Sequence, residues 1–566
     1  MGLKWWQEAV FYQIYPRSFA DGNGDGIGDL AGMHAKLDYL ADLGVDALWL
    51  SPFYPSPLYD CGYDVADYTD IAPEYGTLAE FHAFLDAAHA RGLRLIIDLV
   101  LNHTSHEHRW FRASRASRDN PYRDWYIWRD GRDGGPPNNW MSTFGGSAWE
   151  YDPQTDQYYY HFFLKEQPDL NWRNPEVKAA LFADARFWLE MGVDGFRLDA
   201  IDTIFEHPDL PDHEATLSQA ELLARSQKSS WEARDPEVVV QWEALYEYQL
   251  RQPGIHTLFK ELRALVDTYP DRVLVGETDD VAYYGSGDDE LHLVFNFSLM
   301  RTPRLTPAWI RDNQRERTAA LPPGAWPCNT LGNHDAPRVY NRYGDGEHDA
   351  ELARLSLALM LTLRGTPFLY NGEEIGMTDY LLPDVAQFRD LLGLWYYRLY
   401  TEDLGATPEE AHLMAAQLGR DKCRTPLQWA NAPHGGFCPA EVTPWLPVNP
   451  NYVVGVNVVE QQAAPASLLN FYRQLLHLRR ETPALIAGDV EWLSPQAEDY
   501  LAFVRFTPEQ RCLVALNFSP TEQQVPLALE ALQSVPVFSR VGQVAPLEIP
   551  GLLTLMPFEI YLAILS

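Results

Sequence analysis

The sequence has few cysteines and none in a recognisable motif. They are odd in number and their spacings fit no zinc or redox pattern, at Cys61, Cys328, Cys423, Cys438 and Cys512. Residues 1–16 lack the basic segment and apolar run of a signal peptide. The longest apolar stretch, residues 357–370, is interrupted by Arg364 and is too short to cross a bilayer. These absences predict a cytoplasmic protein with reduced thiols and no membrane contact.

Basic residues are scarce relative to acidic ones. Lys and Arg total 44 against 79 Asp and Glu, which gives a net charge of −35. Such a charge repels nucleic acid and anionic membranes, so neither is expected as a partner, whereas a neutral ligand is unaffected. Aromatic residues make up 13% of the chain. Flat rings suit the faces of sugars, although ordinary core packing accounts for most of them.

Short β-rich runs alternate with amphipathic helical patterns along most of the chain. The helical pattern at 177–192 is followed at once by a strand pattern, as in a βα repeat. The eight runs lie at 11–16, 47–52, 93–100, 194–201, 273–278, 293–297, 327–335 and 366–374. Eight strands in such alternation predict an α/β fold of the (β/α)8 TIM barrel type.

The uneven spacing of these strands predicts the domain organisation. A long Gly-, Pro- and Trp-rich segment follows the third strand, and an unstructured loop of that length is uncommon in a compact domain. From about residue 486, alternating strands without long helices indicate a C-terminal antiparallel β domain. We therefore expect a first barrel part at 1–103, an irregular inserted subdomain at 104–171, a second barrel part at 172–485 with an excursion at about 375–445, and the β domain at 486–566.

The segment VDGFRLDAID, residues 193–202, places two charged side chains on one face of a strand. Strand side chains alternate with a period of two, so Arg197 and Asp199 share a face. Other polar residues follow neighbouring strands in the same way, at Tyr63, Asp64, Asp98, His103, Glu277, His334 and Asp335. Active sites of barrel enzymes lie at this edge. One carboxylate there can be a structural partner of an arginine, but convergence of the whole set predicts a catalytic site.

Glycoside cleavage fits this set of residues. It passes through an oxocarbenium-like state and uses one ionised and one protonated carboxyl. Arg197 should keep Asp199 ionised, which suits a nucleophile, and an apolar setting could raise the pKa of Glu277, which suits a general acid. Asp335 could stabilise positive charge or bind hydroxyls. A metal site is the rival use of such residues, but no HExxH or similar ligand pair lies near them.

The motifs DLVLNH, GFRLDA, VGET and LGNHD, in this order, resemble the four signature regions of the α-amylase family of retaining glycoside hydrolases (glycoside hydrolase family 13). QPDLNW at 167–172 resembles a motif of its oligo-1,6-glucosidase and α-glucosidase subgroup, and RTPLQW at 424–429 is similar to another segment found there. The resemblance implies a nucleophile at Asp199, a general acid/base at Glu277 and a transition-state stabiliser at Asp335.

The resemblance also implies a sugar-binding set. It comprises Asp64, His103, Arg197 and His334, with Tyr63 beside them. In the subgroup an aspartate after strand two pairs with a late arginine and closes the pocket around one terminal glucose; by position these are Asp64 and Arg424, with Arg420 as an alternative. Phe163 and Gln167 are expected to line the pocket, although Phe163 could equally be subdomain core.

Ala200 follows the nucleophile in the sequence. In related enzymes a Val at this position accompanies α-1,6 preference and a smaller residue accompanies α-1,4 preference, so the resemblance favours α-1,4 substrates. Simple packing of Ala200 is the alternative explanation.

The segment DGNGDGIGDL, residues 21–30, concentrates oxygen ligands in a glycine-rich turn. It begins like a calcium loop but has Gly32 where an EF-hand has its bidentate glutamate. We expect a structural Ca²⁺, or Mg²⁺, held by Asp21, Asn23, Asp25, the Ile27 carbonyl and Asp29. A turn held only by side-chain hydrogen bonds is the alternative.

The sequence thus predicts a retaining, exo-acting α-glucosidase that acts on small oligosaccharides, as a monomer or small homo-oligomer without an organic cofactor. Two alternatives remain. A transglycosylase or isomerase of the same family, such as a trehalose synthase or sucrose isomerase, would use the same residues. A binding subunit is disfavoured because the three catalytic carboxylates are present.

Overall fold

The computed structural model describes residues 2–226, 235–529, 533–540 and 545–566. Its central sheet contains eight parallel strands in the order β10-β11-β1-β2-β3-β7-β8-β9. These are β1 (Phe11–Ile14), β2 (Ala47–Leu50), β3 (Arg94–Val100), β7 (Gly195–Asp199), β8 (Val273–Gly276), β9 (Leu293–Val294), β10 (Cys328–Thr330) and β11 (Thr366–Tyr370). Each falls within one of the eight predicted runs, and the (β/α)8 prediction is confirmed.

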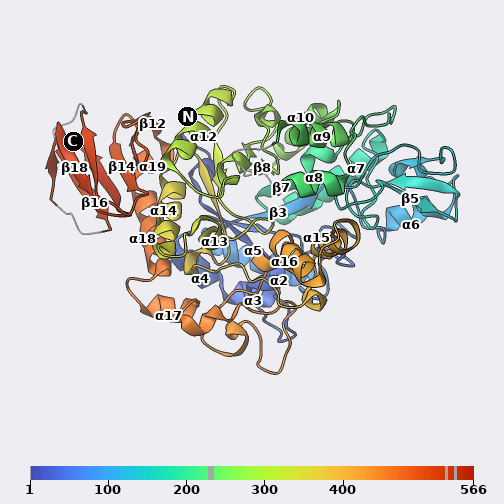
Figure 1. Ribbon diagram of the computed structural model, residues 1–566, viewed down its shortest axis with the longest axis horizontal. Coiled ribbons are helices and arrows are strands. Elements are labelled where there is room, and N and C mark those ends of the chain that lie inside the picture. Colours follow the sequence, from blue (N-terminus) through green and yellow to red (C-terminus); the bar gives the residue numbers. More distant parts are fainter. Residues whose placement is uncertain (1, 227–234, 530–532, 541–544) are drawn as a thin grey trace.

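Helices follow the strands around the outside of this barrel (Figure 1). The main ones are α3 (Leu30–Ala35), α4 (Leu37–Leu43), α5 (Leu78–Ala90), α7 (Pro175–Met191), α10 (Ile255–Val266), α12 (Pro307–Ala320), α14 (Asp349–Thr362) and α18 (Leu468–Glu481). The others are α1 (Trp5–Glu8), α2 (Pro16–Phe19), α6 (Arg109–Ala116), α8 (Gln219–Ser226), α9 (Pro236–Tyr246), α11 (Phe297–Met300), α13 (Val339–Tyr343), α15 (Leu391–Arg398), α16 (Pro408–Leu418), α17 (Val458–Ala463) and α19 (Pro483–Ala487).

Two smaller sheet regions flank the barrel at opposite ends of the long axis (Figure 1). Between β3 and α7, strands β4 (Trp128–Arg129), β5 (Trp149–Asp152) and β6 (Gln157–Tyr160) form a three-stranded antiparallel sheet, within a segment we call subdomain B, residues 104–171. The C-terminal strands are β12 (Asp489–Trp492), β13 (Tyr500–Phe506), β14 (Arg511–Asn517), β15 (Gln523–Leu527), β16 (Gln533–Ser539), β17 (Leu547–Glu548), β18 (Gly551–Leu555) and β19 (Ile560–Leu565), all paired antiparallel.

Helix α7 shows how local sequence fixes these elements. Asn174 caps its N-terminus by accepting a hydrogen bond from the Glu176 amide, and Pro175 occupies the first turn, where its missing N–H costs nothing. Gly192 ends it with φ of 110°, a left-handed conformation that glycine adopts without strain. The helix therefore stops where β7 must start.

An apolar cluster fills the barrel interior below the strand ends. Phe11 and Phe368 stack with centroids 4.4 Å apart, and Trp49 and Phe295 pack beside them. All four side chains are buried. The polar residues at the carboxyl ends of the strands therefore rest on a water-excluding aromatic floor, and Arg197 lies over Trp49, 5.2 Å from its ring centre.

Two buried arginines bond the C-terminal end of α14, one from the barrel and one from the C-terminal domain. Arg479 of α18 donates to the Leu361 carbonyl at 2.7 Å, and Arg505 of β13 donates to the Thr362 and Leu363 carbonyls at 2.6 and 2.8 Å. These carbonyls lie at the C-terminal end of α14 and have no hydrogen-bond donor inside the helix, so the guanidiniums supply one. The positive charges also interact favourably with the negative end of the helix dipole. Burial lowers the pKa of Arg479 to about 10 and lowers that of Arg505 too.

Arg505→Met is expected to destabilise the protein by about 2–4 kcal/mol. The substitution keeps much of the side-chain volume but leaves several buried carbonyls without donors. Urea unfolding followed by circular dichroism measures the effect. Arg511→Met is the matched control on the adjacent strand, where a half-exposed pair with Glu491 should contribute about 0–1 kcal/mol. Equal stability losses in the two variants would contradict this role for Arg505.

Candidate active site

One guanidinium joins the two carboxylates at the ends of β7 and β8. Arg197 contacts Asp199 at 2.5 Å through Nη1 and Glu277 at 2.6 Å through Nη2. Nη1 also lies 3.2 Å from Asp98 of β3. Because one planar group bridges Asp199 and Glu277, their acceptor oxygens face the same small space, which is compatible with the roughly 5–5.5 Å separation of retaining glycosidases.

The backbone explains this convergence. In β7, Phe196 and Leu198 are fully buried on one face, which turns Arg197 and Asp199 to the other, as the alternation predicted. Gly195 allows β8 to approach closely, because a Cβ there would lie 2.1 Å from the Val273 carbonyl oxygen. The strands thus bring their terminal carboxylates together.

Ala200 lies just beyond the end of β7 and not on its apolar face. Its φ of 48° and ψ of 42° are left-handed, a conformation that costs a non-glycine residue about 1 kcal/mol. The strained backbone directs the Ala200 amide to Glu277 Oε2 at 2.8 Å. Glu277 therefore has a partner on each oxygen, the guanidinium charge of Arg197 on one and the Ala200 amide on the other.

Tyr63 and His334 form the next part of the site. The Tyr63 hydroxyl lies 2.6 Å from Nε2 of His334 and 3.0 Å from Asp98, and the two rings stack with centroids 5.4 Å apart. Burial lowers the pKa of His334 to about 3 and that of His103 to about 4, so both rings are neutral at pH 7. Neutral imidazoles can exchange hydrogen bonds with hydroxyls without adding charge.

The predicted pairing of Asp64 with Arg424 is wrong. Asp64 accepts hydrogen bonds from Ser56 and from the backbone amides of residues 59 and 60, so it holds its own loop together. The aspartate that meets a late arginine is Asp60, which contacts Arg420 at 2.7 Å. Asp390 contacts the same guanidinium at 2.7 Å, and we call Asp60, Asp390 and Arg420 the wall.

Arg424 has a different position from the one predicted. It is fully buried, donates from Nε to the His334 carbonyl at 2.9 Å and from Nη2 to Asp335. Arg420 also lies 3.5 Å from Asp335. Burial tends to raise the pKa of Asp335, but the guanidiniums of Arg424 and Arg420 outweigh it and hold that pKa well below the usual range. Asp335 is therefore an anion at all working pH values.

Subdomain B contributes the remaining predicted residues. Gln167 donates from Nε2 to Asp60 at 3.1 Å and lies 2.9 Å from Nε2 of His103, so it connects the wall to the strand-three histidine. The Phe163 ring is half-buried and lies 5.2 Å from the His103 ring, at the border of the pocket. Phe144 packs under the Arg420 guanidinium at 5.5 Å.

Burial dominates the electrostatics of the catalytic carboxyls. It raises the pKa of both Asp199 and Glu277, while the charge of Arg197 opposes the rise in each. Burial also raises the pKa of Asp98 to about 7. One guanidinium cannot neutralise three buried carboxylates, so the cluster retains a proton near neutral pH. Glu277 is its preferred carrier, because Asp199 accepts a hydrogen bond from Arg197 that lowers the pKa of Asp199.

Hydrogen bonds from its backbone amides to its own side chains hold the loop at 21–29. Asp21 accepts from the Gly24 and Gly26 amides at 2.6 and 2.8 Å, and Asp25 accepts from the Ile27 amide at 2.9 Å. Asn23 Oδ1 accepts from the Asp25 amide at 2.9 Å, and Asp29 caps α3. These bonds match the side-chain-bonded turn that was the alternative. In the parts of the chain that the structure describes, no three His, Cys, Asp or Glu side chains are grouped to hold a metal ion.

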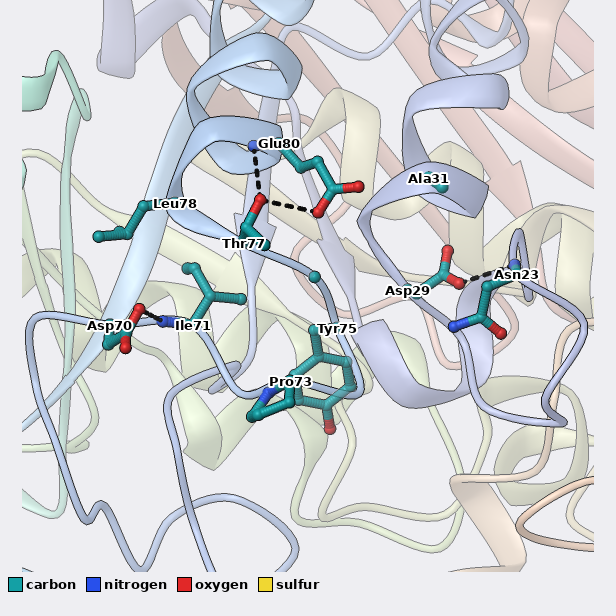
Figure 2. A pocket seen from close by; sticks show the side chains of 11 residues that line it. Asn23, Asp29, Ala31, Asp70, Ile71, Pro73, Tyr75, Thr77, Leu78 and Glu80 are labelled. Carbon is teal, nitrogen blue, oxygen red and sulfur yellow. Dashed lines mark hydrogen bonds between the residues drawn. The ribbon is translucent and has the colours of Figure 1, made fainter.

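A hollow of about 510 Å³ adjoins this loop, away from the catalytic residues. Figure 2 shows Asp29 and Asn23 on one side and Asp70, Thr77 and Glu80 on the other. The polar groups bond locally: Asp70 accepts from the Ile71 amide at 2.8 Å, and Thr77 donates to Glu80 at 2.8 Å. No catalytic side chain lines this hollow, so it is not the active site.

Sequence reasoning missed some residues of the site and left others open. Asp60, four positions before Asp64 in the same loop, was not considered, whereas Arg420, four before Arg424, was the stated alternative. Asp98 was expected at this edge as the end of a strand, without an assigned role. Asp390 and Phe144 have no motif signal, and only the fold brings them to the pocket.

The comparisons with known proteins agree with this geometry. The described residues include no helix long and apolar enough to cross a membrane. An oligo-1,6-glucosidase of Parageobacillus thermoglucosidasius is 40% identical over 532 residues, 91% of this chain and 90% of the relative. A probable alpha-glucosidase of Rhizobium meliloti is 40% identical over 560 residues, 96% of this chain and 95% of the relative.

Solved structures extend the similarity to the whole fold. Trehalulose synthase MutB from Pseudomonas mesoacidophila MX-45 is 37% identical, with a TM-score of 0.89 and 100% of both chains covered. The alpha-amylase catalytic domain family matches residues 13–488. The chain is a glycoside hydrolase and belongs to the α-amylase family.

Proposed function

We propose that this glycoside hydrolase is a retaining, exo-acting α-glucosidase that releases glucose from the non-reducing end of short α-glucosides. The observation that carries the proposal is the bridge that Arg197 makes between Asp199 and Glu277. The wall supports exo action, because the Asp60–Arg420 contact closes one side of the pocket. A neutral sugar also suits a chain with a net charge of −35.

In the first step Asp199 attacks the anomeric carbon while Glu277 protonates the leaving oxygen. The glycosidic bond breaks, a glucosyl–Asp199 ester forms, and the proton leaves with the aglycone. Arg197 bonds Asp199 and keeps part of that cluster ionised, while burial favours the protonated form of Glu277. Asp335, which stays anionic, can stabilise the oxocarbenium-like charge or hold hydroxyl groups.

In the second step water replaces the aglycone. Glu277, now ionised, takes a proton from the water as it attacks the anomeric carbon, and Asp199 leaves as a carboxylate. The ion pair with Arg197 and the hydrogen bond from the Ala200 amide stabilise the ionised form of Glu277 that acts as base. The configuration of the released glucose is therefore retained.

We further propose a preference for α-1,4 over α-1,6 linkages, on the small side chain of Ala200 beside the acid/base. The relatives named oligo-1,6-glucosidase favour the opposite preference. Comparison of kcat/KM on maltose and isomaltose decides between them, and we expect the higher value on maltose. A higher value on isomaltose would refute the linkage proposal and leave the mechanism intact.

A second function has a specific observation in its favour. The solved structure reported above is a trehalulose synthase, which shares this fold over its whole length. An isomerase or transglycosylase would use the same glucosyl ester, with a sugar hydroxyl as acceptor in place of water. Product analysis after incubation with sucrose and with maltose separates these functions. Glucose as the main product supports hydrolysis, whereas trehalulose, isomaltulose or trehalose supports the rival.

The Ca²⁺ or Mg²⁺ ion at residues 21–29 remains a proposal. The Asp21, Asp25 and Asp29 carboxylates bond backbone amides, but an oxygen that accepts one hydrogen bond can still ligate a hard cation. We expect excess EDTA to lower the melting temperature by several degrees, and Ca²⁺ to restore it. Asp21→Asn should make the protein insensitive to EDTA. An unchanged melting temperature in wild-type protein would identify the segment as a turn held by hydrogen bonds alone.

A further inference from the structure

A second hollow, of about 430 Å³, lies between subdomain B and helix α15. We call it the outer hollow. Its lining differs from that of the hollow beside the 21–29 loop, because it is rich in aromatic rings from three separate segments. These rings belong to Tyr59 after β2, Phe144, Trp149 and Phe163 of subdomain B, and Trp395 of α15.

The outer hollow lies on the far side of the wall from the catalytic pocket. Tyr59 directly precedes Asp60, and Phe144 packs against Arg420 at 5.5 Å. The wall residues are nearly buried and bonded to one another, so they separate the two spaces where they lie between them, whereas Phe163 borders both. Because the wall stands between the scissile-bond carboxylates and Trp395, we treat an occupant of the outer hollow as a molecule distinct from the one being cleaved.

Trp395 packs closely against Gly145, which has no side chain to keep it away. A Cβ on Gly145 would lie 1.9 Å from Trp395 Nε1, so the indole rests directly against the backbone of subdomain B. Gly145 has φ of 91°, where other residues are strained. The ring is thus pre-ordered, and a ligand that stacks on it loses little conformational freedom of the protein.

Charged side chains of both signs surround these rings. Glu150, Lys165 and Glu166 of subdomain B and Arg398 of α15 line the outer hollow. Two acids and two bases add no net charge, and the acidic chain as a whole disfavours an anionic ligand. Aromatic faces combined with strong donors and acceptors suit a neutral ligand with apolar C–H faces and many hydroxyls.

We propose that the outer hollow is a second, non-catalytic binding site for a neutral α-gluco-oligosaccharide, with Trp395 as its stacking platform. The choice of sugar rests on the proposed function, since the substrate of that reaction is the polyhydroxyl ligand that gathers at this enzyme. The volume of about 430 Å³ accommodates one or two glucosyl units.

Calorimetric titration with a sulfur-linked maltotriose analogue, which the enzyme cannot cleave, tests the proposal. Saturating 1-deoxynojirimycin first fills the catalytic pocket. We expect the blocked wild-type enzyme to bind one further molecule of the analogue. Trp395→Ala should weaken this binding at least tenfold, while kcat/KM on a chromogenic α-glucoside stays within twofold of wild type. Gly145→Ala keeps the indole but displaces it, and should weaken binding similarly.

Tyr151→Ala is the matched control, because Tyr151 is an exposed aromatic residue of β5 outside the outer hollow. It should leave binding unchanged. If Trp395→Ala fails to fold, Arg398→Ala at the exposed end of α15 replaces it, with an expected loss of severalfold. Absence of binding to the blocked wild-type enzyme, or equal binding by the Trp395 or Arg398 variant, overturns the proposal. Loss of hydrolysis with intact binding would instead refute the proposed function alone.

Discussion

Asp199→Asn is expected to lower kcat/KM on maltose by on the order of 10⁴-fold or more, because it removes the atom that forms the covalent bond to glucose. The amide has nearly the same shape as the carboxylate, so Arg197 loses a charge partner but the pocket keeps its volume. The melting temperature should therefore change little. Initial rates, with protein folding checked by circular dichroism, measure the loss.

Sodium azide makes this experiment specific for a nucleophile. In an Asp199→Ala variant, which leaves empty the space that the amide of Asn would fill, azide can attack the anomeric carbon of an activated α-glucoside from the vacated face, which yields β-glucosyl azide. Asp98→Asn provides a matched control, because Asp98 also contacts Arg197, at 3.2 Å, but lies outside the proposed bond-forming role. Activity near the wild-type level in Asp199→Asn, or azide rescue of the Asp98 variant alone, would move the nucleophile elsewhere.

Glu277→Gln is expected to lower kcat/KM on maltose by about 10²–10⁴-fold, the usual contribution of a positioned acid/base. The loss should be smaller on an aryl glucoside whose leaving group needs no proton, and the glucosyl ester should then accumulate as a burst. Azide should release it as α-glucosyl azide, the anomer opposite to that from the Asp199 variant. Identical anomers from both variants would be inconsistent with the two roles.

The pH profile of this variant gives an independent readout. In the wild type, Asp199 must be ionised and Glu277 protonated, so kcat/KM falls as pH drops through the lower pKa of the pair and falls as pH rises through the higher one. Burial raises both pKa values, so the optimum should lie nearer neutrality than for two ordinary carboxyls. Glu277→Gln should abolish the alkaline limb and retain the acidic one.

Much of this site was predictable because it depends on local patterns. The alternation in GFRLDA places Arg197 and Asp199 on one face, and the ends of parallel strands meet at one edge of a barrel. The order of strands therefore brings Glu277 and Asp335 to the same place. Arg197 was expected beside Asp199, and the structure adds its contacts with Glu277 and Asp98.

The wall was not predictable because it depends on distant parts of the chain. Asp60 and Arg420 are 360 positions apart, and each has a residue of the same type four positions later. Loop conformation alone decides which aspartate faces the pocket: Asp64 turns back to bond its own loop. Likewise, the left-handed backbone at Ala200 could not be predicted, because the sequence there continues the alternating pattern of a strand.

The aromatic floor of Phe11, Trp49 and Phe368 has a kinetic consequence. It blocks the barrel from below, and the wall blocks one side, so the aglycone leaves and water enters through the opening that these two surfaces leave. Water and a sugar hydroxyl then compete for the proposed glucosyl ester at that opening, and the outcome decides whether the product is free glucose or a new disaccharide. Changes to side chains that line the opening should shift the product ratio without altering the chemistry of bond cleavage.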